Sequence, residues 1–137
     1  MENEVFFQLI LAVILGGLIG LERELKKKGA GLRTYSLVSL GSCLFSLIAF
    51  SLANLKILDP SPILTAIAVG MGFIGAGAIF RGETQVFGLT TAAGLWTCAA
   101  IGLAVGAKFY SLAIFSTVLI LIIFYFFGLL EEKLFKK

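Results

Sequence analysis

The side chains in this sequence that could do chemistry are carboxylates and arginines, and they lie in short polar segments between long apolar runs. The chain contains no histidine, which excludes histidine-based acid–base catalysis and histidine-ligated metal sites. Its cysteines, Cys43 and Cys98, lie inside apolar runs, where a free cysteine usually acts as a small hydrophobic residue. Because no serine, threonine or cysteine lies beside a plausible base, we expect no enzyme activity, no resident metal ion and no cofactor.

Three glutamates admit two interpretations. Mg²⁺ usually binds one or two carboxylates and keeps several waters, so Glu22, Glu24 and Glu83 could form a cytoplasmic magnesium site. The interpretation we favour is that these acids pair with nearby arginines in an interfacial salt-bridge network, which would fix the helix ends. The arginines concerned are Arg23, Arg33 and Arg81.

Other polar residues stand at the ends of apolar runs. Asp59 precedes a proline, which is typical of a helix N-cap, although a contact with an external cation or partner is the alternative. Arg81 is either a topology anchor that reaches the headgroups or a gate or anion contact beside the Thr90 and Thr91 hydroxyls. Trp96 falls inside an apolar run, where its N–H needs an acceptor, so we expect it to pack between helices.

The elements that must position these residues are membrane helices. The chain is 59% hydrophobic and 14% charged, with a mean hydropathy of +1.05, whereas soluble domains are about a quarter charged. About 20 apolar residues in a helix cross the bilayer core. We therefore predict one all-α integral membrane domain over residues 1–137, a compact bundle of five transmembrane helices without a soluble domain. The predicted spans are 5–21, 34–53, 63–80, 88–106 and 109–130.

The span over 88–106 is only weakly hydrophobic, and a re-entrant segment is the alternative. Loop charge favours five spans, because Lys and Arg accumulate on the cytoplasmic side. With the N-terminus outside and the C-terminus cytoplasmic, nine basic residues lie inside and only Lys56 and Lys108 lie outside. Without that span the division weakens to seven against four. The nine are Arg23, Lys26, Lys27, Lys28, Arg33, Arg81, Lys133, Lys136 and Lys137.

This distribution accounts for the net charge of +3, so we expect the lipid bilayer as a partner and no nucleic acid. Small residues recur at four-residue steps, a spacing that lets membrane helices pack closely. From these rows we predict an inner pair formed by the third and fourth helices, a lipid-exposed fifth helix, and a homodimer or higher homo-oligomer. The residues predicted to pack or to form an interface are Gly16, Gly20, Gly72, Ala76, Gly102 and Gly106.

Three stretches together resemble the MgtC/SapB family of bacterial inner-membrane proteins. They are GLIGLERE at 17–24 followed by AGLRT at 30–34, GMGFIGAG at 70–77, and GLTTAAGLW at 88–96. The resemblance covers about residues 10 to 110 and implies a non-enzymatic, multi-pass protein of the bacterial cytoplasmic membrane. The family's signature positions carry over as Glu22, Arg23, Glu24, Arg33, Asp59, Arg81, Thr90, Thr91 and Trp96.

The resemblance also implies a role in adaptation to low magnesium, with virulence in some relatives, exerted by binding other membrane proteins. An oligomeric small-ion (Mg²⁺) transporter or channel is the alternative. No ionisable group lies deep within a predicted span, which favours the binding role. The chain has Pro62 and Ala66 where the family commonly has an arginine and a glutamine. We expect the membrane-domain-only form, without the C-terminal soluble domain of many relatives.

Overall fold

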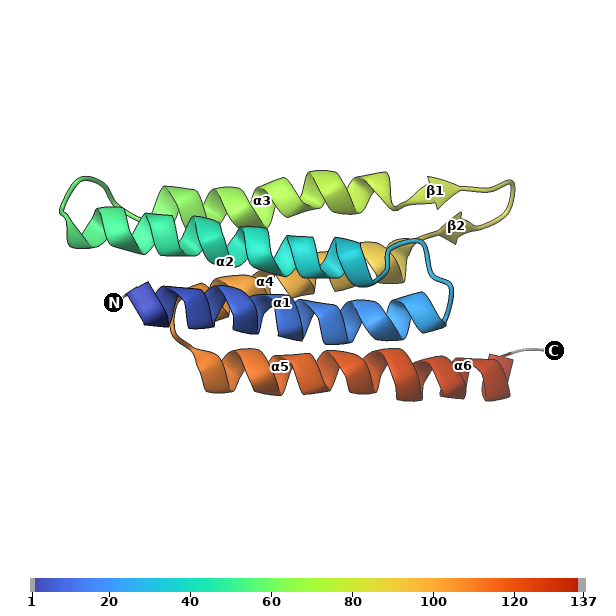
Figure 1. Cartoon of the computed structure of the whole chain (residues 1–137). Helices are drawn as coiled ribbons and strands as arrows, with labels where there is room; N and C mark the ends of the chain where they lie inside the picture. Colours follow the sequence, from blue (N-terminus) through green and yellow to red (C-terminus); the bar gives the residue numbers. More distant parts are fainter. Residues whose placement is uncertain (1, 136–137) are drawn as a thin grey trace.

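A computed structural model describes residues 2–135 of the chain and consists almost entirely of helices that run along one common direction (Figure 1). The last three helical segments follow one another as a single rod, so the bundle has five rods. The elements in chain order are α1 (Glu2–Leu25), α2 (Leu32–Asn54), α3 (Ser61–Gly77), β1 (Phe80–Arg81), β2 (Val86–Phe87), α4 (Leu89–Gly106), α5 (Tyr110–Ile122), the π-helical turn η1 (Ile123–Phe127) and α6 (Gly128–Phe135).

The lengths of the helices suit a membrane. Four of the rods, α1, α2, α4 and the rod over Tyr110–Leu134, are long and apolar enough to cross a bilayer, where a helix satisfies every backbone polar group internally. The all-α membrane bundle of five helices is thereby confirmed. α3 is shorter than these rods. Its 17 residues extend about 26 Å, at about 1.5 Å per residue.

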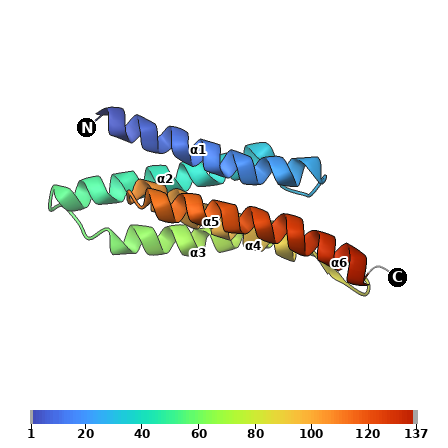
Figure 2. The same cartoon turned by 90° about the horizontal axis from the view of Figure 1, so that it is seen from below.

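The most buried of the long helices is α4, which packs against α1, α2, α3 and α5. In Figure 2 it lies beside α3 and largely behind α5. It is an uninterrupted helix of 18 residues over the segment for which a re-entrant path was the alternative. The predicted inner pair of the third and fourth helices is wrong, because α3 lies at the edge of the bundle and buries only Met71 and Gly75. Small residues permit a close approach between helices, but they do not select which helix approaches.

Four of the glycines predicted to pack lie close against α2. A Cβ atom added to Gly16 would lie 2.6 Å from the Tyr35 carbonyl oxygen, and one added to Gly106 would lie 2.6 Å from Ser46 Cβ. Gly20 and Gly102 approach the α2 backbone in the same way, at Leu32 and Ser39 respectively. By contrast, Gly72 has no neighbour within 4 Å, and Ala76 is exposed. The glycines of α1 and α4 therefore pack within the chain, whereas the row on α3 does not.

The third helix ends earlier than predicted. It stops at Gly77, and Phe80–Arg81 instead pairs with Val86–Phe87 as a two-stranded antiparallel hairpin that extends beyond the bundle (Figure 1). The Phe80 and Phe87 rings stack with their centroids 5.2 Å apart. Gly88 then begins α4 with a φ of 85°, a left-handed conformation that glycine adopts without strain.

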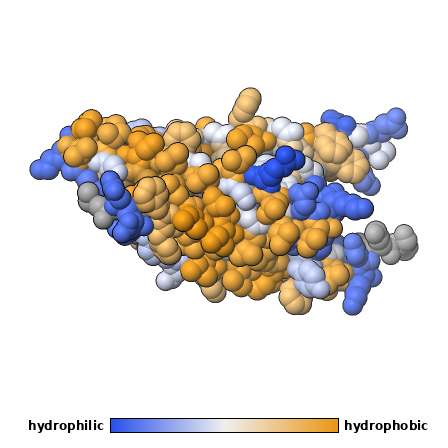
Figure 3. Space-filling model, in the orientation of Figure 1, coloured by the Kyte–Doolittle hydropathy of each residue, from blue (hydrophilic) through white to orange (hydrophobic). Residues whose placement is uncertain are grey.

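The two ends of the bundle differ in charge. The α1–α2 connector with Lys26–Lys28, the hairpin with Arg81, and α6 lie at one end, which we call the basic end (Figure 1). At the opposite end Lys108 forms an ion pair with Glu4 at 2.8 Å. Hydrophilic side chains gather toward the ends, and hydrophobic side chains cover most of the surface between them (Figure 3). Lys136 and Lys137, counted above among the inside residues, lie outside the described residues.

Candidate functional site

A buried arginine at the basic end is the centre of the site. Arg23 is only 4% exposed, although it lies in the last turn of α1. Its Nη2 donates to the Thr91 hydroxyl of α4 at 3.5 Å, and its guanidinium carbon lies 4.2 Å from the centroid of the Phe124 ring in η1. A cation over an aromatic face is attracted by the ring quadrupole, more strongly when both are desolvated. Arg23 thus connects the first, fourth and fifth rods.

Glu22 lies between two cations. Its carboxylate oxygens are 3.6 Å from Arg23 Nη1 and 3.1 Å from Lys26 Nζ, and its side chain is 13% exposed. Neither oxygen accepts a hydrogen bond of good geometry from the described residues, so these are ion pairs. Lys26 Nζ also donates to the Phe124 carbonyl at 3.2 Å. That carbonyl belongs to the π-helical turn, a feature frequent at functional sites.

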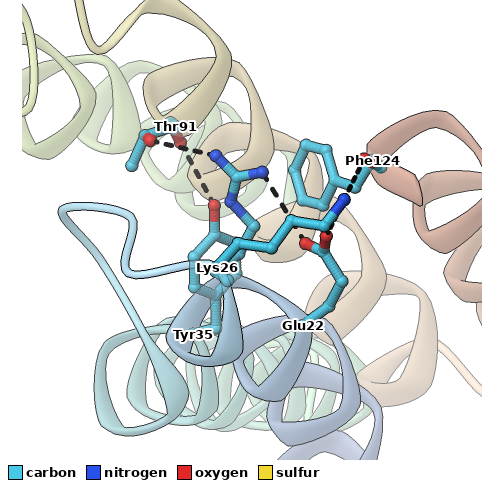
Figure 4. A network of polar contacts seen from close by, with 6 residues as sticks. Glu22, Lys26, Tyr35, Thr91 and Phe124 are labelled. Carbon is cyan, nitrogen blue, oxygen red and sulfur yellow. Dashed lines mark hydrogen bonds and ion pairs between the residues drawn. The ribbon is translucent and has the colours of Figure 1, made fainter. Parts of the chain in front are cut away.

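Tyr35 completes the cluster from α2. The side chain is fully buried, and its hydroxyl donates to the Thr91 carbonyl at 3.4 Å. Gly94, one turn further along α4, provides the space for this arrangement. A Cβ atom there would lie 2.6 Å from both the Tyr35 hydroxyl and the Phe124 ring. The charge cluster, as we call Glu22, Arg23, Lys26, Tyr35, Thr91 and Phe124, therefore brings together α1, α2, α4 and η1 (Figure 4).

The chemistry of the charge cluster is ionic. One carboxylate and two cations give it a formal excess of one positive charge, and removing one partner of a buried ion pair is costly. No group of three His, Cys, Asp or Glu side chains within residues 2–135 is placed to hold a metal ion. In particular, Glu24 is engaged elsewhere, because its Oε2 accepts from the Leu32 N–H at 3.0 Å. The ionic contacts of the cluster join α1 to α4 and to η1.

The predicted salt-bridge network forms only in part. Arg23 pairs with Glu22, whereas Arg33 and Arg81 are exposed and pair with no carboxylate of the described chain. Thr90 is exposed, and it is Thr91 that contacts an arginine, namely Arg23 instead of Arg81. The hairpin takes Arg81 away from the helix end at which it was predicted.

Asp59 lies at the opposite end, before α3. Its Oδ1 accepts from the Ser61 N–H at 2.9 Å and from the Ser61 hydroxyl at 2.8 Å. These two hydrogen bonds favour the ionised carboxylate, so they hold the pKa of Asp59 below its ordinary value of 3.8. Both contacts hold Ser61, the first residue of α3, while the N-cap position itself is occupied by Pro60, which makes no side-chain capping bond.

Trp96 is not buried between helices as predicted. Its side chain is 55% exposed on α4 beside α3. Its Nε1 does find a carbonyl acceptor, because it donates to the Ala68 carbonyl at 3.2 Å. The indole reaches across the edge of α3, whose peripheral position leaves the ring uncovered.

Sequence reasoning missed several residues of the site. Tyr35, Lys26 and Phe124 are contacts made across helices, and no spacing in the sequence signals them. Gln8 was also missed; it is 1% exposed, and its Nε2 donates to the Val105 and Gly106 carbonyls at 2.8 and 3.1 Å. A lone amide in an apolar run was the available signal, because a polar side chain in a membrane span needs a partner.

Comparison with known proteins gives a consistent result. A sequence model of the MgtC family matches residues 9–133. YhiD of Escherichia coli (strain K12), described as a proposed magnesium transporter, is 41% identical over all of this chain and 66% of its own length. SapB of Bacillus subtilis is 39% identical over 88% of this chain and 55% of its own. MgtC of Brucella abortus is 44% identical over 80% of this chain and 45% of its own.

The chain thus spans between about half and two thirds of the length of these curated relatives. No solved structure matches it.

Proposed function

This chain belongs to the MgtC family, and from that premise we propose that it is a non-enzymatic protein of the bacterial cytoplasmic membrane. We propose further that it serves adaptation to low magnesium by binding other membrane proteins, among them a second copy of itself. The link to magnesium rests on the description of the relative from Escherichia coli, with which this chain aligns over its whole length.

An exposed row of small residues on α3 carries the proposal of a binding role. Ala68, Gly72 and Ala76, which we call the small-residue stripe, follow one another at four-residue steps and are exposed. They lie beside the half-exposed ring of Trp96, which contacts Ala68. Membrane helices associate through small residues that let backbones approach closely. The stripe therefore suits a helix of another membrane protein better than it suits lipid.

The interior of a single chain supports binding over transport. Arg23 is the only charged side chain of the described residues that is buried, and it lies at the basic end. Between the two ends, the buried face of α4 consists of apolar residues such as Leu95, Cys98 and Ile101. Ion and proton paths across membranes are usually marked by ionisable groups within the spans. One chain offers no such series of groups within residues 2–135.

The basic end is proposed to face the cytoplasm. Lysine and arginine accumulate on that side of membrane proteins. The α1–α2 connector, the hairpin and α6 share this end, and Lys56 and Lys108 lie in connectors of the opposite end (Figure 1). The N-terminus would then lie outside. This arrangement also suits a protein inserted in the cytoplasmic membrane.

The experiment compares two glycines of α3 that both face open space. Gly72 belongs to the small-residue stripe, and Gly77 does not; neither has a neighbour within 4 Å, so leucine fits at both. We expect Gly72→Leu to abolish energy transfer between two differently labelled copies in proteoliposomes and to abolish growth rescue at low magnesium in a bacterium lacking its own protein. Gly77→Leu should retain both. Rescue by Gly72→Leu would contradict the binding role of the stripe.

An oligomeric Mg²⁺ transporter is the second candidate, and the description of the Escherichia coli relative favours it. Such a path would have to form between copies of the chain. Mg²⁺ flux into proteoliposomes decides between the two functions, measured with wild type and with Arg81→Ala. We expect no saturable uptake. Saturable uptake that is lost in Arg81→Ala would overturn the binding role.

A further inference from the structure

A long groove separates α2 from α3. It has a volume of about 890 Å³ and is lined by Leu37, Gly41 and Phe45 of α2 and by Ile67, Gly70 and Ile74 of α3. The buried polar side chain of its wall, Ser42, is already engaged, because its hydroxyl donates to the Ala99 carbonyl at 2.6 Å. An aqueous occupant would find few partners there, so the groove suits hydrocarbon.

The groove follows the helices and is long enough to cover the depth of one lipid leaflet. On α2 its lining extends from Thr34 to Ile48, which corresponds to about 21 Å at about 1.5 Å per residue. One leaflet contributes about 15 Å of hydrocarbon, half of the roughly 30 Å core. The groove therefore gives an acyl chain an apolar wall along the whole depth of the leaflet at the basic end.

A cation stands at the headgroup end of this groove. Residues four apart on a helix share a face, so Arg33 continues the lining row Leu37, Gly41 and Phe45 by one turn toward the basic end. Arg33 is exposed and pairs with no carboxylate of the described chain. On the other side, α3 leads into β1, which carries the exposed Arg81 at the same end (Figure 1).

We propose that the groove between α2 and α3 binds an anionic phospholipid, with the acyl chains along the apolar lining and the headgroup phosphate at Arg33. Charge complementarity selects this occupant over a second copy of the chain. An apolar helix inserted into the groove would leave the Arg33 guanidinium without a counter-charge, whereas a phosphate accepts its hydrogen bonds in a bidentate geometry. Basic pockets between membrane helices are known binding places for anionic headgroups.

The test measures lipid retained by the purified full chain after detergent exchange, by native mass spectrometry. The probes are phosphatidylglycerol and phosphatidylcholine with identical acyl chains. We expect about one phosphatidylglycerol to remain bound and phosphatidylcholine to be retained at least about fivefold less, which corresponds to about 1 kcal/mol for one arginine near the surface. Arg33→Gln should reduce phosphatidylglycerol to the phosphatidylcholine level. Lys56→Gln, at the opposite end, should leave its retention unchanged.

Two glycines test the acyl-chain part. Gly41 and Gly70 line the groove and have no neighbour within 4 Å, so a leucine at either fills the groove without disturbing the fold. Gly41→Leu and Gly70→Leu should abolish retention of phosphatidylglycerol, while Gly77→Leu, equally open but outside both the lining and the small-residue stripe, should not. Equal retention of both lipids, or undiminished retention in Gly41→Leu, would overturn the proposal. So would a loss of self-association in Gly41→Leu with lipid retention intact, because the occupant would then be a second copy.

Discussion

The guanidinium carbon of Arg23 lies 4.2 Å from the centroid of the Phe124 ring, so the first and last rods of the bundle meet through a cation–π contact at the basic end. The contact is desolvated, because Arg23 is 4% and Phe124 is 6% exposed. The contact links residues that are far apart in the sequence. It attaches the fifth rod to α1, the helix that also carries Glu22.

The energy of that contact can be measured by a double-mutant cycle. We expect Arg23→Met and Phe124→Leu to couple by about 1 to 2 kcal/mol in the free energy of unfolding, the range for a desolvated cation–π pair. The measurement is denaturant unfolding in detergent micelles. A parallel cycle with the exposed Arg33 in place of Arg23 should give a coupling near zero. A coupling near zero in the first cycle would show that the two residues are neighbours without a favourable interaction.

Glu22 should be the most sensitive residue of the charge cluster. Glu22→Gln keeps the shape of the side chain but leaves Arg23 and Lys26 without their shared counter-charge. Breaking a buried pair costs roughly 3 kcal/mol, which should appear as a lower unfolding free energy. The exposed hairpin residue provides the control, since Glu83→Gln should change the unfolding free energy by less than about 0.5 kcal/mol. Equal effects of the two substitutions would mean that the ion pairs contribute little.

Gly102 should tolerate no side chain. Its α carbon faces the Ser39 backbone of α2 so closely that leucine would force α2 and α4 apart. Overpacking of this kind costs about 3 kcal/mol or more, so Gly102→Leu should lower the melting temperature and the yield of monodisperse protein. Gly41→Leu, which enters open space, should melt as wild type does. A normal melting temperature for Gly102→Leu would contradict the observed packing of α4 on α2.

The start of α3 should depend on pH through Asp59. Because the folded-state pKa of Asp59 is below the ordinary 3.8, its ionised form stabilises the fold above that value, and the stabilisation is lost as pH falls through the folded-state pKa. The protection factors of the amides near Ser61 in hydrogen exchange, relative to the unfolded chain at the same pH, should therefore fall below about pH 4. Asp59→Asn can still accept from Ser61 but does not titrate, so its protection factors should lack this fall. Identical pH profiles for the two proteins would rule out Asp59 as the cause.

The orientation of the bundle can be tested by labelling. Single cysteines at Lys27 and Lys133 should react with an impermeant thiol reagent from the same side of the membrane, and one at Lys56 should react from the other. The native Cys43 and Cys98 are buried and free, so they should contribute little background. Labelling of Lys27→Cys and Lys133→Cys from opposite sides would show that an odd number of spans separates them, which would contradict the five-span topology.

Much of the fold follows from the sequence because the bilayer imposes it. A helix is the one way in which an apolar run such as Tyr110–Leu134 can satisfy its backbone in lipid, so the five helices and their approximate positions were predictable. The sequence did not predict which helices pack against one another. Gly72 and Gly102 look alike in the sequence, yet a Cβ atom added to Gly102 would meet the Ser39 backbone, whereas one added to Gly72 would meet nothing within 4 Å. The difference lies in the rotation of each helix about its own axis.

The site was predictable to a smaller extent. Glu22, Arg23 and Thr91 were identified as candidates, but the burial of Arg23 was not, because a residue near the end of a span usually reaches the headgroups. The position of the Phe124 side chain depends on the π-helical turn, and the apolar run IFYFF contains no signal that predicts such a turn. Arg81 was assigned to a helix end that the hairpin replaces.

Two side chains of α1 fasten both ends of α4, with Gln8 at the Val105 and Gly106 carbonyls and Arg23 at Thr91. The fifteen steps from Gln8 to Arg23 and the fourteen from Thr91 to Val105 correspond to about 22 and 21 Å of helix, so the two antiparallel segments have matching lengths. Neither helix can slide along the other without breaking the bonds at its two extremities together. We therefore expect α1 and α4 to move as one unit, whereas α3, which buries only Met71 and Gly75, is held by fewer buried side chains.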